Sequence, residues 1–93
     1  MYIRTPSDMG ALIRARRTAL RLDQKTVAEK VGVSRQWMVD VEKGKPGAEI
    51  GLVMRTVDAL GIVLIADKPP KGTRLARPLI LDAIVAAARK KRK

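Results

Sequence analysis

The sequence predicts an all-α domain of four to five helices, with one short strand near its C-terminal end. Four segments between residues 7 and 60 carry apolar residues at helical spacing, and most of them lie between a capping residue and a glycine. The run Ile62-Val-Leu-Ile-Ala66 is apolar and largely β-branched, which is typical of a strand. A chain of 93 residues holds one such domain, here residues 1–71, and a basic tail, residues 72–93.

The first predicted helix follows the cap Ser7 and runs to about Leu20, because a serine can accept a hydrogen bond from the free N–H groups of a first turn. Its inward residues are expected to be Met9, Leu12, Ile13 and Leu20. The fourth helix is expected over about residues 49–60 and stops at Gly61. Its inward residues are expected to be Ile50, Val53, Met54, Val57 and Leu60.

A very short connection separates the second and third predicted helices. The second follows the cap Asp23 and ends at Gly32, and the third follows the cap Ser34 and ends at Gly44. Their inward residues are expected to be Val27, Ala28, Val31, Met38 and Val41. Helices joined only by Gly-Val-Ser cannot fold back antiparallel, so they must cross steeply. The sequence therefore predicts a helix-turn-helix, whose second helix enters the major groove of DNA.

The first turn of the third helix carries Arg35 and Gln36. Arginine can donate two hydrogen bonds to guanine O6 and N7, and glutamine can pair in the same way with adenine N6 and N7. Both residues are also good exposed helix formers. The caps, the short turn and the net charge of +11 together favour a role in reading bases.

Positive charge is concentrated at the end of the chain, since residues 67–93 hold nine Lys/Arg against two Asp/Glu. This excess favours a polyanionic partner, either nucleic acid or an acidic membrane surface. Cysteine is absent, which suits the reducing cytoplasm. The N-terminus lacks the apolar core of a signal peptide, and the longest apolar run is too short to span a bilayer. We therefore expect a cytoplasmic, nucleoid-associated protein.

Enzyme chemistry finds little support in the composition. Without histidine or cysteine there is no Ser-His arrangement and no histidine or thiolate metal site. Asp40 and Glu42 are two residues apart on a helix, so they do not face each other. The stretch Gly44-Lys-Pro-Gly47 lacks the full pattern of a phosphate-binding loop. No catalytic residue, cofactor or metal is expected.

The stretch LIRARRTALRLDQKTVAEKVGVSRQWMVDVEKGKPG resembles the lambda/Cro-repressor-type helix-turn-helix, or Xre family, over roughly residues 9–60. Its specific part is Gln-x-x-x-Ala-x-x-x-Gly-Val-Ser followed by Val-Glu-Lys-Gly. Within this family the chain is most similar to HipB-like antitoxins, through Thr-Pro-Ser-Asp, Gly-Lys-Pro-Gly-Ala-Glu and the closing apolar run. The resemblance implies a lambda-repressor-like fold and a dimeric operator-binding repressor that neutralises a HipA-like kinase toxin.

The resemblance also implies roles for single residues. Base reading falls to Arg35, Gln36 and Asp40. Phosphate contacts fall to Gln24, Lys25, Ser34, Trp37, Lys43 and Lys45. Gln24 is also implied to brace the third helix, which is the recognition helix. The family more often has a polar amide side chain at the position of Asp40. A carboxylate there can only accept hydrogen bonds, for instance from cytosine N4. Alternatively, Asp40 is a surface charge that DNA repels. Trp37 either packs on the sugar-phosphate backbone or covers the edge of the core.

Two charged residues fall on apolar helix faces. Arg17 lies four residues after Ile13 and three before Leu20, and Glu42 lies four residues after Met38. A partly buried charge needs a partner. In the family that the chain resembles, matching positions form an Arg–Glu pair between the first and third helices. Arg17 and Glu42 are therefore expected to form a structural ion pair.

A single strand cannot satisfy its own backbone. Either residues 62–66 continue the fourth helix, or they pair with the same strand of a second subunit in an antiparallel ribbon. HipB-like proteins dimerise in this second way. The resemblance thus assigns dimerisation to Ile62, Val63, Leu64, Ile65 and Ala66.

The tail allows three interpretations: a disordered phosphate-binding arm, an apolar and basic helix that docks on a partner or on its own dimer, or a membrane-surface helix. Residues 79–85 are too apolar to remain exposed to water, which favours a docked helix from about Leu79. The expected function is repression of the protein's own operon, on an inverted-repeat operator, with toxin neutralisation. The alternatives are a stand-alone Xre-type regulator without a toxin, or a basic interaction protein that uses the fold as a scaffold.

Overall fold

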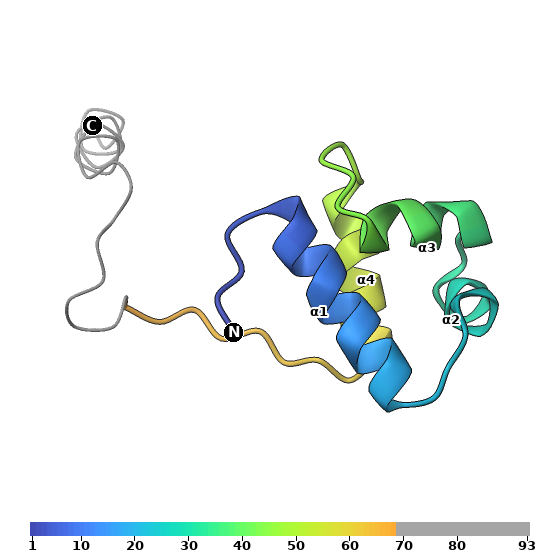
Figure 1. The fold of residues 1–93 in the computed structure, drawn as a ribbon, viewed down its shortest axis with the longest axis horizontal. Helices are drawn as coiled ribbons and strands as arrows, with labels where there is room; N and C mark the ends of the chain where they lie inside the picture. Colours follow the sequence, from blue (N-terminus) through green and yellow to red (C-terminus); the bar gives the residue numbers. More distant parts are fainter. Residues whose placement is uncertain (69–93) are drawn as a thin grey trace, which may run out of the picture.

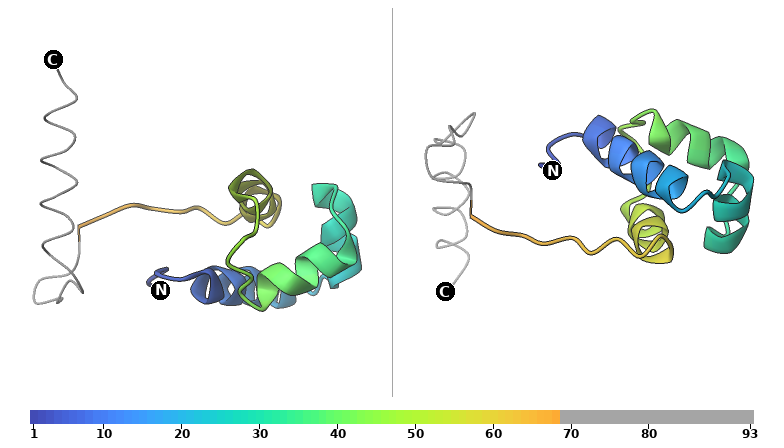
Figure 2. Two further views of the ribbon diagram at one scale, coloured as in Figure 1. Left: turned by 90° about the horizontal axis from the view of Figure 1, so that it is seen from above. Right: turned by 60° about the horizontal axis from the view of Figure 1, so that its bottom comes forward.

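The computed structural model describes residues 1–68, and within them the chain forms four α-helices. These are α1 (Pro6–Ala19), α2 (Gln24–Val31), α3 (Arg35–Glu42) and α4 (Ile50–Ala59). Helix α3 packs against both α1 and α2, and α4 packs against α2 (Figure 1). Figure 2 shows α1 and α3 side by side with α2 at one end of the pair. The predicted domain boundary at residue 71 and the basic tail lie outside the described residues.

Helix α1 begins at a different cap from the one the sequence predicts. Thr5 Oγ1 accepts the Asp8 N–H at 3.1 Å, and Asp8 Oδ2 accepts the Thr5 N–H at 3.1 Å, which makes a capping box. The prediction of Ser7 as the cap was wrong, because the helix begins two residues earlier, where Thr5 and Asp8 satisfy each other's free backbone N–H groups. The backbone N–H of Arg4 also donates to Asp8 and lowers the pKa of its carboxyl. This cap therefore weakens as the pH falls through that lowered pKa.

The predicted caps of α2 and α3 are confirmed. Asp23 Oδ1 accepts the Thr26 N–H at 2.7 Å, and Ser34 Oγ accepts the Trp37 N–H at 2.9 Å. The hydrogen bond from Thr26 lowers the pKa of the Asp23 carboxyl. Both helices thus begin at the residues that the sequence indicates.

The core lies between all four helices. Its buried members are Ile13, Val27, Ala28, Val31, Met38, Val41, Val57 and Leu60. Three predicted core residues are exposed instead: Leu20 by 41%, Ile50 by 76% and Met54 by 49%.

The exposure of these three residues has two separate causes. Leu20 is the C-cap of α1 and lies beyond its last turn. Helix α4 is turned so that Thr56 faces the core in place of Ile50 and Met54. The Thr56 hydroxyl donates to Leu52 O at 2.8 Å, so this side chain is buried without an unsatisfied polar group.

The segment after α4 does not continue the helix. Gly61 has a φ of 68°, and the chain then runs as an extended, irregular segment toward the N-terminus (Figure 1). Residues 62–66 form no strand in this single chain, because no neighbouring strand is present within residues 1–68 to receive their hydrogen bonds. No helix of residues 1–68 is long and apolar enough to cross a membrane.

Candidate nucleic-acid interface

The corner between α2 and α3 is made by three residues. Gly32 ends α2 with a φ of 90°, a left-handed conformation that favours glycine. The N–H groups of Gly32 and Val33 both donate to Ala28 O, at 2.8 and 2.9 Å. Ser34 then caps α3, which crosses α2 steeply: in Figure 1, α2 is seen end-on and α3 from the side. This local geometry is that of a helix-turn-helix.

A buried ion pair holds α3 against α1. Arg17 Nε lies 2.7 Å from Glu42 Oε2 and Arg17 Nη2 lies 2.9 Å from Glu42 Oε1, while the side chains are 12% and 4% exposed. Arg17 Nη1 also donates to Leu22 O at 2.9 Å. The hydrogen bond to Glu42 raises the pKa of the Arg17 guanidinium, which therefore stays charged. The structure thus contains the pair that the sequence predicts.

Gln24, at the start of α2, joins this pair. Its Nε2 lies 3.3 Å from Glu42 Oε1, so α1, α2 and α3 meet at a single carboxylate. The orientation of α3 is consequently fixed by hydrogen bonds as well as by the core. This is the bracing role that the family resemblance implies for Gln24.

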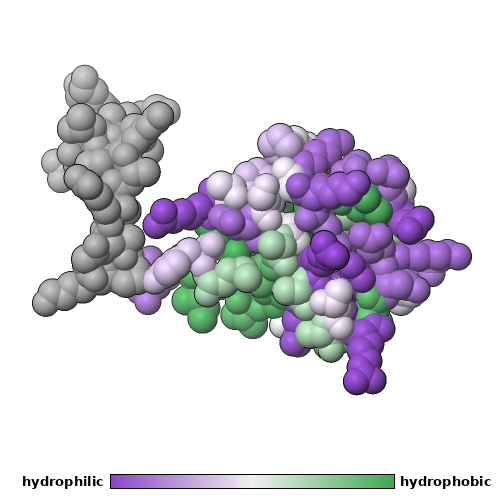
Figure 3. Space-filling view, in the orientation of Figure 1, coloured by the Kyte–Doolittle hydropathy of each residue, from purple (hydrophilic) through white to green (hydrophobic). Residues whose placement is uncertain are grey.

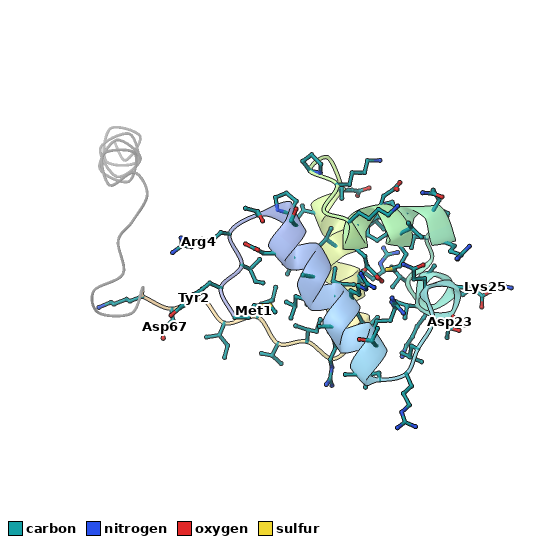
Figure 4. All side chains as sticks on the ribbon, in the orientation of Figure 1. Met1, Tyr2, Arg4, Asp23, Lys25 and Asp67 are labelled. Carbon is teal, nitrogen blue, oxygen red and sulfur yellow. The ribbon has the colours of Figure 1, made fainter. Side chains whose placement is uncertain are left out.

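The surface around the ion pair is hollow and basic. This basic hollow, of about 650 Å³, is lined by Arg14, Arg17, Asp23, Gln24, Lys25, Arg35, Val39, Glu42 and Lys43. Its two acidic residues are already engaged, since Glu42 pairs with Arg17 and Asp23 caps α2. Within residues 1–68 the other four cations of the hollow form no salt bridge. The hollow therefore offers uncompensated positive charge beside the first turn of α3, with Lys25 on the α2 side in Figure 4.

The predicted base-reading residues lie along the exposed side of α3. Arg35 and Gln36 are exposed in its first turn, and Asp40 is half-buried one turn later. Gln36 Nε2 donates to Asp40 Oδ1 at 2.9 Å, a bond that sequence reasoning did not anticipate. Asp40 therefore orients the Gln36 amide and leaves its carbonyl oxygen and its second N–H available. Residues four apart on a helix surface are neighbours, so their spacing carried this signal.

The remaining predicted phosphate contacts lie at the two ends of α3. Lys43 and Lys45 are exposed at the end of α3, where the Lys45 N–H donates to Asp40 O at 3.1 Å. The Ser34 hydroxyl oxygen accepts from Trp37 N–H, which leaves its own O–H free to donate. Trp37 is half-buried and packs against the core, the second of the two roles that the sequence leaves open.

Sequence reasoning missed two residues of the basic hollow. Arg14 lies on α1 one turn before Arg17, and this spacing of three residues was the available signal, because both residues then share one face of α1. Val39 lies between Arg35 and Lys43 along α3 and adds an apolar contact point. Neither carries an obvious sequence motif.

A braced helix-turn-helix beside unpaired cations is typical of a DNA-binding protein, and comparison with known proteins agrees with this class. A family model described as a helix-turn-helix domain matches residues 8–64, so the chain belongs to this family. Among its relatives is an uncharacterized HTH-type transcriptional regulator, y4mF, of Sinorhizobium fredii. The two are 44% identical over 59 residues, which cover 63% of this chain and 78% of that protein.

An uncharacterized HTH-type transcriptional regulator of Methanothermobacter thermautotrophicus is 42% identical over 59 residues, which cover 63% of this chain and 86% of that protein. Both relatives are described as transcriptional regulators and not as enzymes. The chain is thus a member of the helix-turn-helix transcriptional regulators, a family of DNA-binding proteins.

Solved structures support the narrower resemblance at the level of the fold. The protein in a HipB-O4 20mer complex has a TM-score of 0.67 and 13% identity, over 73% of this chain and 96% of that one. A HipB variant in complex with an O2 20mer gives the same TM-score and identity over 94% of its protein chain. The predicted Xre-type helix-turn-helix, with a HipB-like fold, is confirmed.

Proposed function

We propose that this protein is a sequence-specific repressor that binds double-stranded DNA as a homodimer at the operator of its own operon. One observation carries the proposal: Arg35 and Gln36 are exposed at the start of a helix that a buried ion pair holds in place. Beside them lie three further cations, Arg14, Lys25 and Lys43, that form no salt bridge within residues 1–68. Such a helix start is the part of a helix-turn-helix that reaches base edges, and free cations match the phosphates on either side.

Each exposed group of the interface has a matching group on DNA. Arg35 is suited to guanine O6 and N7, and Gln36, held by Asp40, to adenine N6 and N7. The Val39 methyl groups are suited to a thymine methyl. Phosphates are the partners of Ser34, Lys25, Lys43, Lys45 and the newly placed Arg14. Gln24 acts through Glu42, because its amide nitrogen is directed to that carboxylate.

The homodimer is proposed to form through residues 62–66. In this chain they are extended, mostly exposed and lack backbone partners within residues 1–68, apart from the Ile62 N–H, which donates to Val57 O at 3.0 Å. Pairing with the same segment of a second copy would satisfy these groups around a two-fold axis. The operator should then be an inverted repeat whose half-sites lie one helical turn, or a multiple of it, apart.

Within this function we propose the role of a HipB-like antitoxin that also binds a HipA-like kinase toxin. The motifs around α1 and α4 support this role, and the fold is compatible with it. Co-expression with the kinase of a neighbouring gene should relieve growth arrest. Persistence of the arrest, with operator binding intact, would leave a stand-alone regulator.

Removal of the arginine in the first turn of α3 tests the base-reading role. Arg35→Ala should weaken operator binding by roughly 1–3 kcal/mol and relax the preference at one base position per half-site. Lys45→Ala is the control, since the loss of a phosphate contact should weaken operator and random DNA about equally. Mobility shifts at one fixed salt concentration measure both. If Arg35→Ala lowered affinity for operator and random DNA alike, Arg35 would not read a base.

A charge in the middle of residues 62–66 tests the dimer. Leu64→Lys should raise the dimer dissociation constant about tenfold or more, because the exposed part of two leucines per dimer is no longer buried and a charge stands in each paired segment. Leu20→Lys is the matched control, since Leu20 and Leu64 are both 41% exposed. Sedimentation measures the dimer and circular dichroism the helices. An unchanged dimer in Leu64→Lys would exclude the ribbon.

A further inference from the structure

The two ends of the described chain form an apolar groove. Residues 1–4 and 62–68 lie on its two sides, and Met9 and Leu12 of α1 lie between them, around a volume of about 770 Å³. In Figure 3 apolar surface gathers on this side of the molecule, and Figure 4 places Met1 and Tyr2 near the segment that ends at Asp67. We name these residues the terminal groove.

Side chains of the outgoing segment alternate in exposure. Ile62 packs against the core and Leu64 is 41% exposed, whereas Val63 and Ile65 are 80% and 83% exposed. This is the alternation of an extended chain, with one face on the domain and one face turned away. In a ribbon with a second copy, the backbone edges of the two segments pair. The face that carries Val63 and Ile65 would then remain exposed to solvent. Dimerisation alone therefore does not cover the terminal groove.

The remaining chain contains one segment suited to cover this face. Five of the seven residues in 79–85 are large and apolar: Leu79, Ile80, Leu81, Ile84 and Val85. Asp82 is the only acidic residue of residues 69–93, and the groove is lined by two cations, Arg4 and Lys68, against one carboxylate, Asp67. The segment and the groove are thus complementary in both hydrophobicity and charge.

The connection is long enough for this segment to return. Ten residues, 69–78, separate it from Lys68, which itself lines the groove. A chain of this length spans up to about 33 Å, and docking requires only that it reverse. Pro69, Pro70 and Gly72 are residue types that favour such a turn.

We propose that residues 79–85 dock in the terminal groove of the same chain and cover Val63 and Ile65. Docking anchors the basic run Arg89–Lys93 beside the domain, so that it acts from a fixed position and not from the end of a free linker. This goes beyond the proposed function, because neither base reading nor the ribbon requires it.

The accessibility of an introduced thiol tests the docking. Because the chain has no cysteine of its own, all labelling reports on the one introduced residue. Ile65→Cys should react with an uncharged maleimide at least about tenfold more slowly in the full chain than in a chain that ends at Lys71. The full chain with Ile80→Lys and Ile84→Lys should react as fast as the truncated one. Glu29→Cys, exposed on α2 at the other end of the domain, is the control and should react equally fast in all three.

Equal Ile65→Cys rates in the full and truncated chains, whether fast or slow, would overturn the docking. If the slow reaction of Ile65→Cys became fast on dilution to the monomer, the partner copy would be covering this residue. That result would overturn docking within one chain. Sedimentation and operator binding of the same Ile65→Cys proteins report separately on the ribbon and on DNA recognition. Failure of the docking and failure of the proposed function are therefore distinguishable.

Discussion

Glu42→Ala should lower the free energy of unfolding by about 3 kcal/mol, because it leaves Arg17 partly buried without its counter-charge. The loss lies at the lower end for a broken buried pair, since Arg17 keeps its bond to Leu22 O and can reach solvent. In a domain of this size such a loss is a large part of the total stability. Gln24 also loses its acceptor, so the brace on α3 weakens at the same time.

Urea denaturation followed by circular dichroism measures this effect. The double change Arg17→Met with Glu42→Leu should recover much of the stability, because an apolar pair of similar volume leaves no buried charge. Glu42→Gln should fall between Glu42→Ala and the native protein, since it keeps hydrogen-bond acceptance but loses the charge. A midpoint for Glu42→Ala equal to that of the native protein would show that the pair contributes nothing to the fold.

Gly10→Ala should have an effect of similar size, about 3 kcal/mol, at the upper end of what overpacking costs. Gly10 is buried where α1 meets the end of α3. An added Cβ would lie 2.3 Å from Val41 O and 2.7 Å from Glu42 O, and these backbone atoms cannot rotate away. The two helices would have to separate, which would also lengthen the Arg17–Glu42 bonds.

Gly51→Ala is the matched control, because this glycine is exposed on α4 and its added Cβ would come no closer than 3.6 Å to another atom, the end of the Glu49 side chain. That change should stabilise the protein by about 0.5–1 kcal/mol, the usual gain of alanine over glycine in a helix. Thermal unfolding compares the pair. Equal melting temperatures for Gly10→Ala and Gly51→Ala would contradict the close approach of α1 and α3.

Local features of the site could be predicted from the sequence because they depend on near neighbours. The caps Asp23 and Ser34 bind N–H groups three residues away, and Gly32 ends α2 through its own conformation. The order of the helices and the short corner follow from these signals. The same features put Arg35 and Gln36 in the first turn of α3.

Contacts within the site were only partly predictable. Helical spacing put Arg17 and Glu42 on inward faces, and the family resemblance paired them. The bond from Gln36 to Asp40 depends on side-chain rotamers, and the place of Arg14 in the basic hollow depends on how α1 crosses α3. Sequence spacing states which residues share a helix face, but it does not state what that face meets.

The sequence by itself determined the helices, the helix-turn-helix and the residues of its first turn, since each rests on hydrogen bonds or periodicity within a few residues. The tertiary structure alone decided the rotation of α4, which exposes Ile50 and Met54 and buries Thr56. Periodicity favoured the most apolar stripe of α4, whereas packing requires the stripe whose shape and hydrogen bonds fit the core. Thr56 fits because its hydroxyl donates a hydrogen bond to Leu52 O of its own helix, so its burial leaves no polar group unsatisfied. A pattern of apolar residues does not contain this hydrogen bond.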